Sequence, residues 1–221
     1  RGVTIAVPML SDMEDKLEWH DLMGDSKLFS VCEVWNSIWP RSDVVDWYNV
    51  VWFPNCIPSY AFHLWLVAKR RLKTQDRLRP WDIIGNTMLM CCPLCDGPPD
   101  SHDHLFYDFP FSTQVWNELK VMAGLPNVIG SISSIVNVLL PIAKHQTIRS
   151  VIGKLVVAAS SYYIWQERNS RLFSTKKRTH GQLTECIKSS IRLKLLSCVF
   201  KKSKDALHFK RLWDIPNYSF R

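Results

Sequence analysis

Cys92-Pro93-Leu94-Cys95, followed after eight residues by His104-Leu105-Phe106, is the stretch on which the fold of this chain depends. A Cys-x2-Cys pair places two thiolates at the tip of a tight turn. A histidine one short loop later can close a third side of a tetrahedron around Zn²⁺. The spacing therefore predicts a zinc-knuckle-like turn in which Cys92, Cys95 and His104 are metal ligands.

A fourth ligand is needed, because a structural zinc ion almost always takes four protein ligands. A zinc knuckle carries a cysteine five residues after its histidine, but this position is Phe109, which cannot coordinate a metal. Asp108 is the first candidate, since a helix beginning at His104 would place both side chains on one face. His102 and Cys91 are further candidates. The alternative is that zinc binding has been lost and that Phe109 packs where the cysteine once lay.

Seven segments occur in an informative order: LFSV at 28–31, WYNVVW at 47–52, AFHLWL at 61–66, TQDRL at 74–78, CPLC at 92–95, HLF at 104–106 and VW at 115–116. In this order they resemble the plant reverse-transcriptase zinc-binding domain. The segment YIWQERNSRLF at 163–173 is similar to the helix that commonly follows that domain. Together these segments cover most of residues 15–173.

The resemblance implies the C-terminal region of the polyprotein of a LINE-type (non-LTR) retrotransposon. It implies Zn²⁺ as the cofactor, although the last metal cysteine of the family is absent at Phe109. RNA or DNA, bound with little regard to sequence, is the implied partner. A polymerase domain upstream in the parent polyprotein is a further candidate partner.

Basic charge is concentrated in the C-terminal third of the chain. The net charge is +8, but residues 144–221 hold 17 Lys and Arg against 4 Asp and Glu, whereas residues 1–143 hold 11 against 16. This asymmetry is typical of a surface that binds a polyanion, although a lysine-rich face is also the ordinary solvated face of a helix. The candidate nucleic-acid-binding residues are Lys69, Arg70, Arg71, Arg77, Lys176, Lys177, Arg178, Lys201 and Lys202.

Hydrophobic periodicity and proline positions predict a mainly α fold with two small β-hairpins, one across the turn at 23–26 and one at the Cys-x2-Cys turn. Helices are expected at 31–39, 43–53, 59–71, 75–78 and, from an N-cap at Ser112, to about Ala123. A short helix follows to Lys144. Helices at 148–173 and 179–201 should then form an antiparallel helical hairpin, and residues 207–221 should be loose.

Three regions follow from this pattern. Residues 15–123 are expected to form a reverse-transcriptase zinc-binding-like domain. Residues 124–144 are expected to be a linker with a short helix, because Gly124, Pro126 and Gly130 lie close together. Residues 145–221 are expected to form a basic C-terminal helical region.

The sequence lacks the signatures of catalysis. Neither the paired aspartates of a polymerase nor the four carboxylates of a ribonuclease H are evident, and no phosphate-binding glycine loop occurs. We therefore expect no enzyme. Two functions remain: a zinc-organised nucleic-acid-binding module, or a degraded fragment that acts as a structural or protein-interaction module.

The cysteines and the hydropathy indicate where the protein works. Seven cysteines without a signal peptide, three of them within 91–95, favour a reducing compartment, the nucleus or the cytoplasm. No apolar run approaches the ~20 residues of a membrane span. The chain is therefore expected to be soluble.

Overall fold

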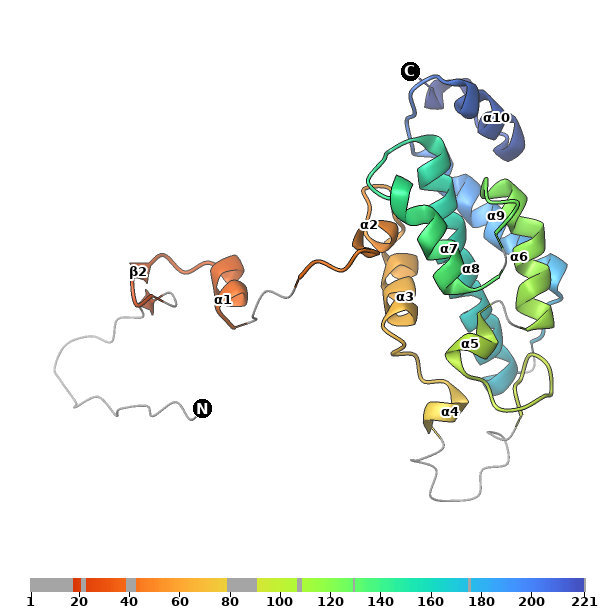
Figure 1. Cartoon of the computed structure of the whole chain (residues 1–221), viewed down its shortest axis with the longest axis horizontal. Coiled ribbons are helices and arrows are strands. Elements are labelled where there is room, and N and C mark those ends of the chain that lie inside the picture. Colours follow the sequence, from red (N-terminus) through yellow and green to blue (C-terminus); the bar gives the residue numbers. More distant parts are fainter. Residues whose placement is uncertain are drawn as a thin grey trace. The chain divides into compact units, whose positions relative to one another are not determined.

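The computed structural model describes residues 18–20, 23–38, 43–78, 91–106, 109–128, 130–174 and 176–220 (Figure 1). The chain divides into two compact units, Arg1–Val44 and Val45–Arg221. The predicted domain boundaries at 123/124 and 144/145 both lie inside the second unit. None of the described helices is long and apolar enough to cross a lipid bilayer.

The first unit contains the predicted N-terminal hairpin. Strand β1 (Trp19–His20) pairs antiparallel with β2 (Ser26–Lys27), with Trp19 opposite Lys27. Gly24 lies in the turn with a φ of +89°, a conformation that favours glycine. Helix α1 (Val31–Ile38) follows, so the hairpin and the helix expected here are both confirmed. The second expected hairpin, at the Cys-x2-Cys turn, is not found in the described residues 91–95, which form a tight turn because the N–H groups of Cys95 and Asp96 donate to the Cys92 carbonyl. Residues 88–90 lie outside the described residues.

The regular elements described in the second unit are helices and 3₁₀ turns, apart from one isolated bridge between Phe200 and Phe220. Its elements are α2 (Tyr48–Val51), α3 (Pro58–Ala68), α4 (Gln75–Leu78), α5 (His102–Leu105), α6 (Pro110–Met122), α7 (Ile132–Leu139), the 3₁₀ turn η3 (Leu140–Ile142), α8 (Ile148–Phe173), α9 (His180–Leu196), α10 (Lys204–Trp213) and the 3₁₀ turn η4 (Asn217–Ser219). The prediction of a mainly α fold is therefore confirmed.

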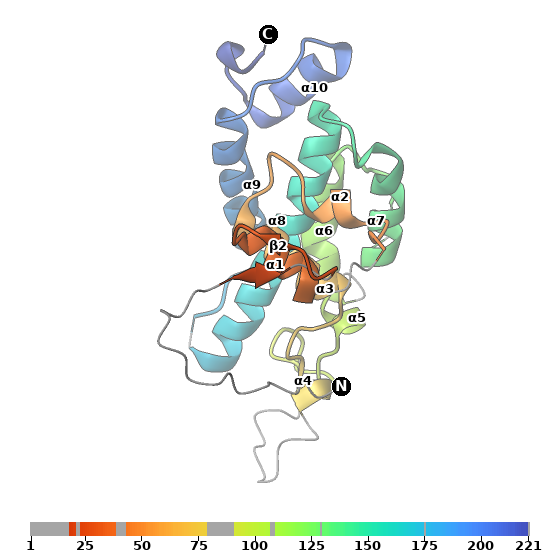
Figure 2. The same cartoon turned by 90° about the vertical axis from the view of Figure 1, so that its left-hand side faces the viewer.

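Helix α8 is the centre of this unit, and α3, α6, α7, α9 and α10 all pack against it (Figures 1 and 2). It begins where the Thr147 side chain accepts a hydrogen bond from the Ser150 N–H. Ala158, Ala159 and Ser160 are buried halfway along it, and such small side chains let neighbouring helices approach closely. The hydroxyl of Ser160 donates to the Val156 carbonyl 2.6 Å away, so this buried polar group is satisfied.

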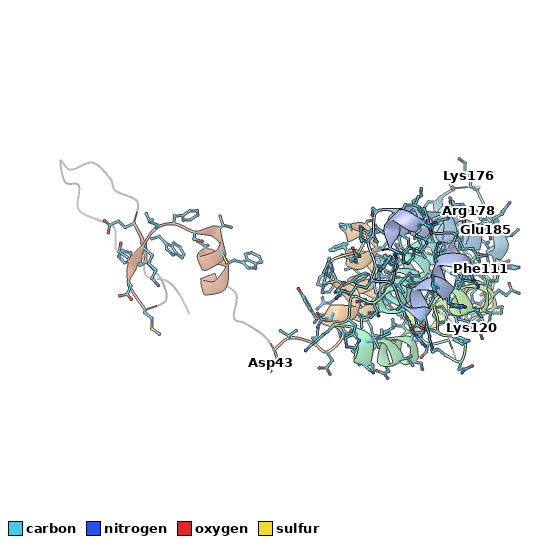
Figure 3. The ribbon with its side chains drawn as sticks, turned by 90° about the horizontal axis from the view of Figure 1, so that it is seen from above. Asp43, Phe111, Lys120, Lys176, Arg178 and Glu185 are labelled. Atoms are coloured by element: carbon cyan, nitrogen blue, oxygen red, sulfur yellow. The ribbon has the colours of Figure 1, made fainter. Side chains whose placement is uncertain are left out.

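Helices α8 and α9 form the predicted antiparallel hairpin (Figure 2). Thr179 and Gln182 make a capping box at the start of α9. Four aliphatic side chains, one every four residues from Leu183 to Leu195, are fully buried, and each contributes about 1.5–3 kcal/mol. The connection at 174–179 carries Lys176 and Arg178, which lie at the edge of the unit (Figure 3).

Helix α6 begins three residues earlier than expected. Its N-cap is Phe109 and its first residue is Pro110, whose fixed φ suits the first turn of a helix. Ser112, the predicted N-cap, is buried, and its hydroxyl donates to the Phe109 carbonyl 3.1 Å away. The prediction failed because a proline at the first helical position was a stronger start signal than the serine.

The predicted linker is packed rather than exposed. Leu125, Val128, Ile135 and Leu139 are all buried, so residues 124–144 contribute to the core of the second unit. Gly124 has a φ of +72°, and a Cβ placed there would lie 2.8 Å from the Phe209 ring. This glycine therefore permits close packing instead of marking a flexible connection.

The C-terminal segment is also more ordered than expected. Residues 207–221 were predicted to be loose, but α10 and η4 occupy most of this range. Phe209 and Trp213 are buried, and the Trp213 indole N–H donates to the Met122 carbonyl at 3.0 Å. The apolar face at 206, 209 and 213 recurs with helical spacing, which was the signal for this helix.

Candidate metal centre and basic surface

The Cys-x2-Cys segment forms a closed turn. The Cys92 N–H donates to the Gly97 carbonyl at 3.0 Å, and the N–H groups of Cys95 and Asp96 donate back to the Cys92 carbonyl. The Gly97 N–H lies 3.3 Å from Cys95 Sγ, so a backbone donor supports the sulfur. A Cβ on Gly97 would lie 3.1 Å from the same sulfur, which explains why glycine fits this position.

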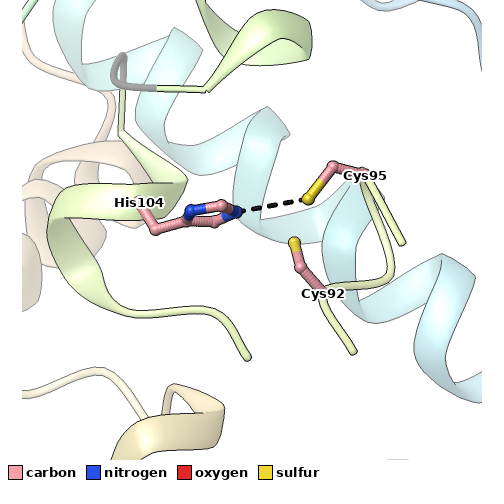
Figure 4. Close-up of side chains that lie close together, drawn as sticks. All are labelled: Cys92, Cys95 and His104. Atoms are coloured by element: carbon pink, nitrogen blue, oxygen red, sulfur yellow. Dashed lines mark hydrogen bonds between the residues drawn. The ribbon is translucent and has the colours of Figure 1, made fainter. Parts of the chain in front are cut away.

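Cys92, Cys95 and His104 converge as the spacing predicted (Figure 4). One ligand atom from each residue lies within 4.8 Å of the others. Cys95 Sγ and His104 Nε2 are 3.4 Å apart, close to the separation of two ligands on one zinc ion. Cys92 is buried, whereas Cys95 and His104 are partly exposed, so a metal ion can enter from one side.

Helix α5 fixes the position of His104. The Ser101 side chain accepts the His104 N–H at 3.2 Å and caps the helix. The Phe109 ring stacks on the His104 ring with centroids 5.1 Å apart and an angle of 20° between the planes. Phe109 is buried, which confirms the expectation that this side chain packs beside the cluster.

Two of the three candidates for the fourth ligand are directed elsewhere. His102 Nε2 accepts the Leu72 N–H at 3.1 Å, and its other ring nitrogen faces Thr74. Cys91 is exposed and is not part of the cluster. Asp108, the first candidate, lies outside the described residues. Among the residues that are described, only Cys92, Cys95 and His104 form such a group.

The chemistry of these donors fits zinc. Two sulfurs and one imidazole nitrogen are the atoms that structural zinc sites use. Burial raises the pKa of the Cys92 thiol to about 12, and the nearby Cys95 adds to this shift. Without a cation the Cys92 thiol therefore stays neutral, and a divalent ion must displace its proton to bind that sulfur.

Residues 29–116 match the family model described as zinc-binding in reverse transcriptase, zf-RVT. The predicted resemblance is therefore confirmed over this range. The zf-RVT segment contains all three converging donors. No curated protein and no solved structure gives a significant match to the chain.

Helix α8, which lies beyond the zf-RVT match, is directly tied to the loop between Cys95 and His104. Asp100 and Arg168 form an ion pair with side chains 0% and 2% exposed, and the guanidinium donates to both carboxylate oxygens, at 2.7 and 3.2 Å. Asp100 also accepts the Gln75 N–H at 2.8 Å. Sequence reasoning missed Asp100. The RNSR run of α8 was the available signal, but it was interpreted only as part of the resemblance.

A second contact of α8 reaches the turn itself. Arg171 donates to the carbonyl of Leu94, which lies between the two cysteines, at 3.4 Å. Gln75 holds the residue before the turn, because its side-chain amide donates to the Cys91 carbonyl at 2.9 Å. The zinc-knuckle-like turn is therefore held from outside by α4 and α8.

All nine candidate nucleic-acid-binding residues are exposed, but they fall in four separate segments of the sequence. Lys69, Arg70 and Arg71 follow the end of α3, where Arg70 pairs with Asp103 and Lys69 lies over the Trp47 ring. Arg77 belongs to α4. Lys176, Lys177 and Arg178 lie in the α8–α9 connection, and Lys201 and Lys202 lie between α9 and α10.

Proposed function

We propose that this protein is a non-catalytic, zinc-organised module that binds RNA or DNA largely without sequence preference. One observation carries the zinc part of the proposal: Cys92, Cys95 and His104 converge inside the segment that matches a zinc-binding family. The exposed basic residues of the same unit support the nucleic-acid part. The proposal includes a retrotransposon polyprotein as the origin of the chain.

Zinc would serve a structural purpose in this site. A bound Zn²⁺ would join the turn at 92–95 to the first turn of α5. Ser101 and Phe109 already hold His104 from two sides, so this ligand needs little further ordering by the metal. The turn and α5 together form the edge of the unit against which the end of α8 is fixed through Arg168 and Arg171.

Nucleic-acid binding would rest on phosphate contacts. Lys176, Lys177 and Arg178 are exposed in one short connection, and each cation that neutralises a phosphate releases counterions. Such contacts position a nucleic acid without reading its bases. Affinity should therefore depend steeply on salt and weakly on sequence.

Two measurements test this proposal. Metal analysis of protein purified without added chelator should give one zinc per chain, and a Cys92→Ser, Cys95→Ser double variant should give none. Binding of a single-stranded RNA, a single-stranded DNA and a DNA duplex should weaken linearly on a log–log plot against salt. A chain that binds no metal, or none of the three nucleic acids at 50 mM salt, would contradict the corresponding part.

A protein-interaction module is the second candidate, and exposed apolar residues of the first unit favour it. Leu28, Phe29 and Val31 are each at least 70% exposed. Apolar side chains gathered in this way often mark a protein interface. An upstream polymerase domain is the partner to test, and binding to that domain without binding to nucleic acid would favour this second function.

A further inference from the structure

A short chain of hydrogen bonds joins the zinc-knuckle-like turn to the basic connection between α8 and α9. Arg171 donates to the Leu94 carbonyl at 3.4 Å on one side and to the Arg178 carbonyl at 2.7 Å on the other. Leu94 is 77 residues from Arg171 in the sequence and Arg178 is 7 residues from it, yet the Arg171 guanidinium contacts both.

Glu167 completes this link. Its Oε1 accepts from Arg171 at 2.8 Å and from the Arg178 N–H at 2.8 Å. Both backbone polar groups of Arg178 are therefore held, one by Arg171 and one by Glu167. The Arg178 side chain remains exposed beside Lys176 and Lys177.

The two side chains that form this link are largely buried. The Glu167 and Arg171 side chains are 1% and 13% exposed, and the Arg171 guanidinium lies 4.7 Å from the centre of the Phe111 ring. Glu167 Oε2 is buried and has no hydrogen-bond partner among the described residues. Arg171 therefore neutralises a carboxylate that would otherwise be poorly compensated.

We infer that Arg171 is a positioning residue that couples metal binding at Cys92, Cys95 and His104 to nucleic-acid binding at Lys176, Lys177 and Arg178. This inference rests on the proposed function. Leu94 lies between two of the three metal donors, so the direction of its carbonyl depends on how firmly the turn is closed. A closed turn gives Arg171 a fixed acceptor, and Arg171 with Glu167 then holds the connection in one conformation.

The physical gain is preorganisation. A connection that is already ordered loses less conformational entropy when its cations meet phosphates, and the affinity rises by that difference. Linkage makes the effect reciprocal: bound nucleic acid must raise zinc affinity by the same factor by which zinc raises nucleic-acid affinity. Couplings of this kind are typically about 5–150-fold.

The test measures zinc affinity by chelator competition, with and without a saturating single-stranded RNA of 20 uridines. The wild-type chain should bind zinc at least about fivefold more tightly when RNA is present. In Arg171→Met this factor should fall to about one. Arg192→Met is the matched control, because Arg192 also contacts a carboxylate and a carbonyl, both of Asp214, and should keep the wild-type factor.

A second measurement needs no variant. Hydrogen exchange of the Arg178 amide, which donates to Glu167, should slow when zinc is added to metal-free wild-type protein. The inference is overturned if zinc leaves this amide unchanged, or if RNA binds but does not alter zinc affinity. In the latter case the proposed function stands and only the coupling fails, whereas absence of RNA binding would overturn both.

Discussion

Phe109 stacks on His104 with ring centroids 5.1 Å apart, at the position where a zinc knuckle would carry its last cysteine. The aromatic ring thus orients the only imidazole of the described metal cluster without being able to bind a metal itself. Restoring a sulfur at this position is the most direct way to learn whether the cluster lacks a ligand.

Phe109→Cys should raise zinc affinity by at least about tenfold, because a third thiolate would supply the fourth ligand of a tetrahedral set. It should also destabilise the metal-free protein by about 3–5 kcal/mol through the lost ring. Chelator competition measures the first effect and denaturant unfolding in EDTA measures the second. Phe109→Ala is the control for the cavity alone. If the two variants and the wild type bind zinc equally, Asp108 or another residue already completes the site.

Asp100→Asn should destabilise the protein by about 3–5 kcal/mol, because it leaves the guanidinium of Arg168 buried without its anion. Asp214→Asn removes the carboxylate of an exposed pair with Arg192 and should cost no more than about 1 kcal/mol. Urea unfolding of both variants in EDTA makes the comparison. Similar losses of stability in the Asp100 and Asp214 variants would show that the Asp100–Arg168 pair is far more hydrated than its burial indicates.

His63 should make the metal-free protein less stable in acid. Burial, and secondarily the charge of His102, lowers the pKa of His63 from 6.5 to about 4. The unfolded chain therefore binds more protons between these values, so stability rises with pH across this window and is lost as the pH falls from 6.5 to 4. The effect amounts to about 3 kcal/mol.

His63→Phe isolates this contribution, because a phenyl ring fills much of the same space without titrating. The free energy of unfolding of wild type and variant is measured at pH 7 and at pH 4.5 in EDTA. Between these values the wild type should lose more stability than the variant. A difference that is constant with pH would mean that His63 accepts a proton without disturbing the fold.

Reversing the charge of Lys176, Lys177 and Arg178 together should weaken binding to every nucleic acid. Each lost phosphate contact should reduce the log–log salt slope by about 0.7 for single strands and 0.9 for duplexes. The same reversal at Lys144, Lys188 and Lys204 changes the net charge equally and should leave the slope closer to that of the wild type. Equal effects of the two triple variants would assign binding to overall charge instead of to the α8–α9 connection.

Local patterns predicted much of this structure. Helix α8 begins and ends where its apolar run does, because Thr147 caps one end and no proline interrupts the next 26 residues. The convergence of Cys92, Cys95 and His104 also followed from spacing alone, since a short loop joins the turn to α5. These features depend on residues that are near one another in the chain.

The failures involve partners that are distant in sequence. Gly124 and Pro126 indicated a linker, but Phe209 packs on Gly124 from a helix that begins 80 residues later. Asp100 was missed because its partner, Arg168, lies 68 residues away in the sequence. Periodicity reports which face of a helix is apolar, but it does not report which other segment covers that face.

The ion pair between Asp100 and Arg168 also sets a limit on how the protein can be divided for biochemistry. A recombinant fragment trimmed to the zf-RVT match at 29–116 would retain all three metal donors but lose α8, and with it the cation of Asp100. Val115 and Trp116, now buried, would sit at the cut end of such a fragment. Fragments intended to report on metal affinity should therefore extend at least through Phe173, the last residue of α8.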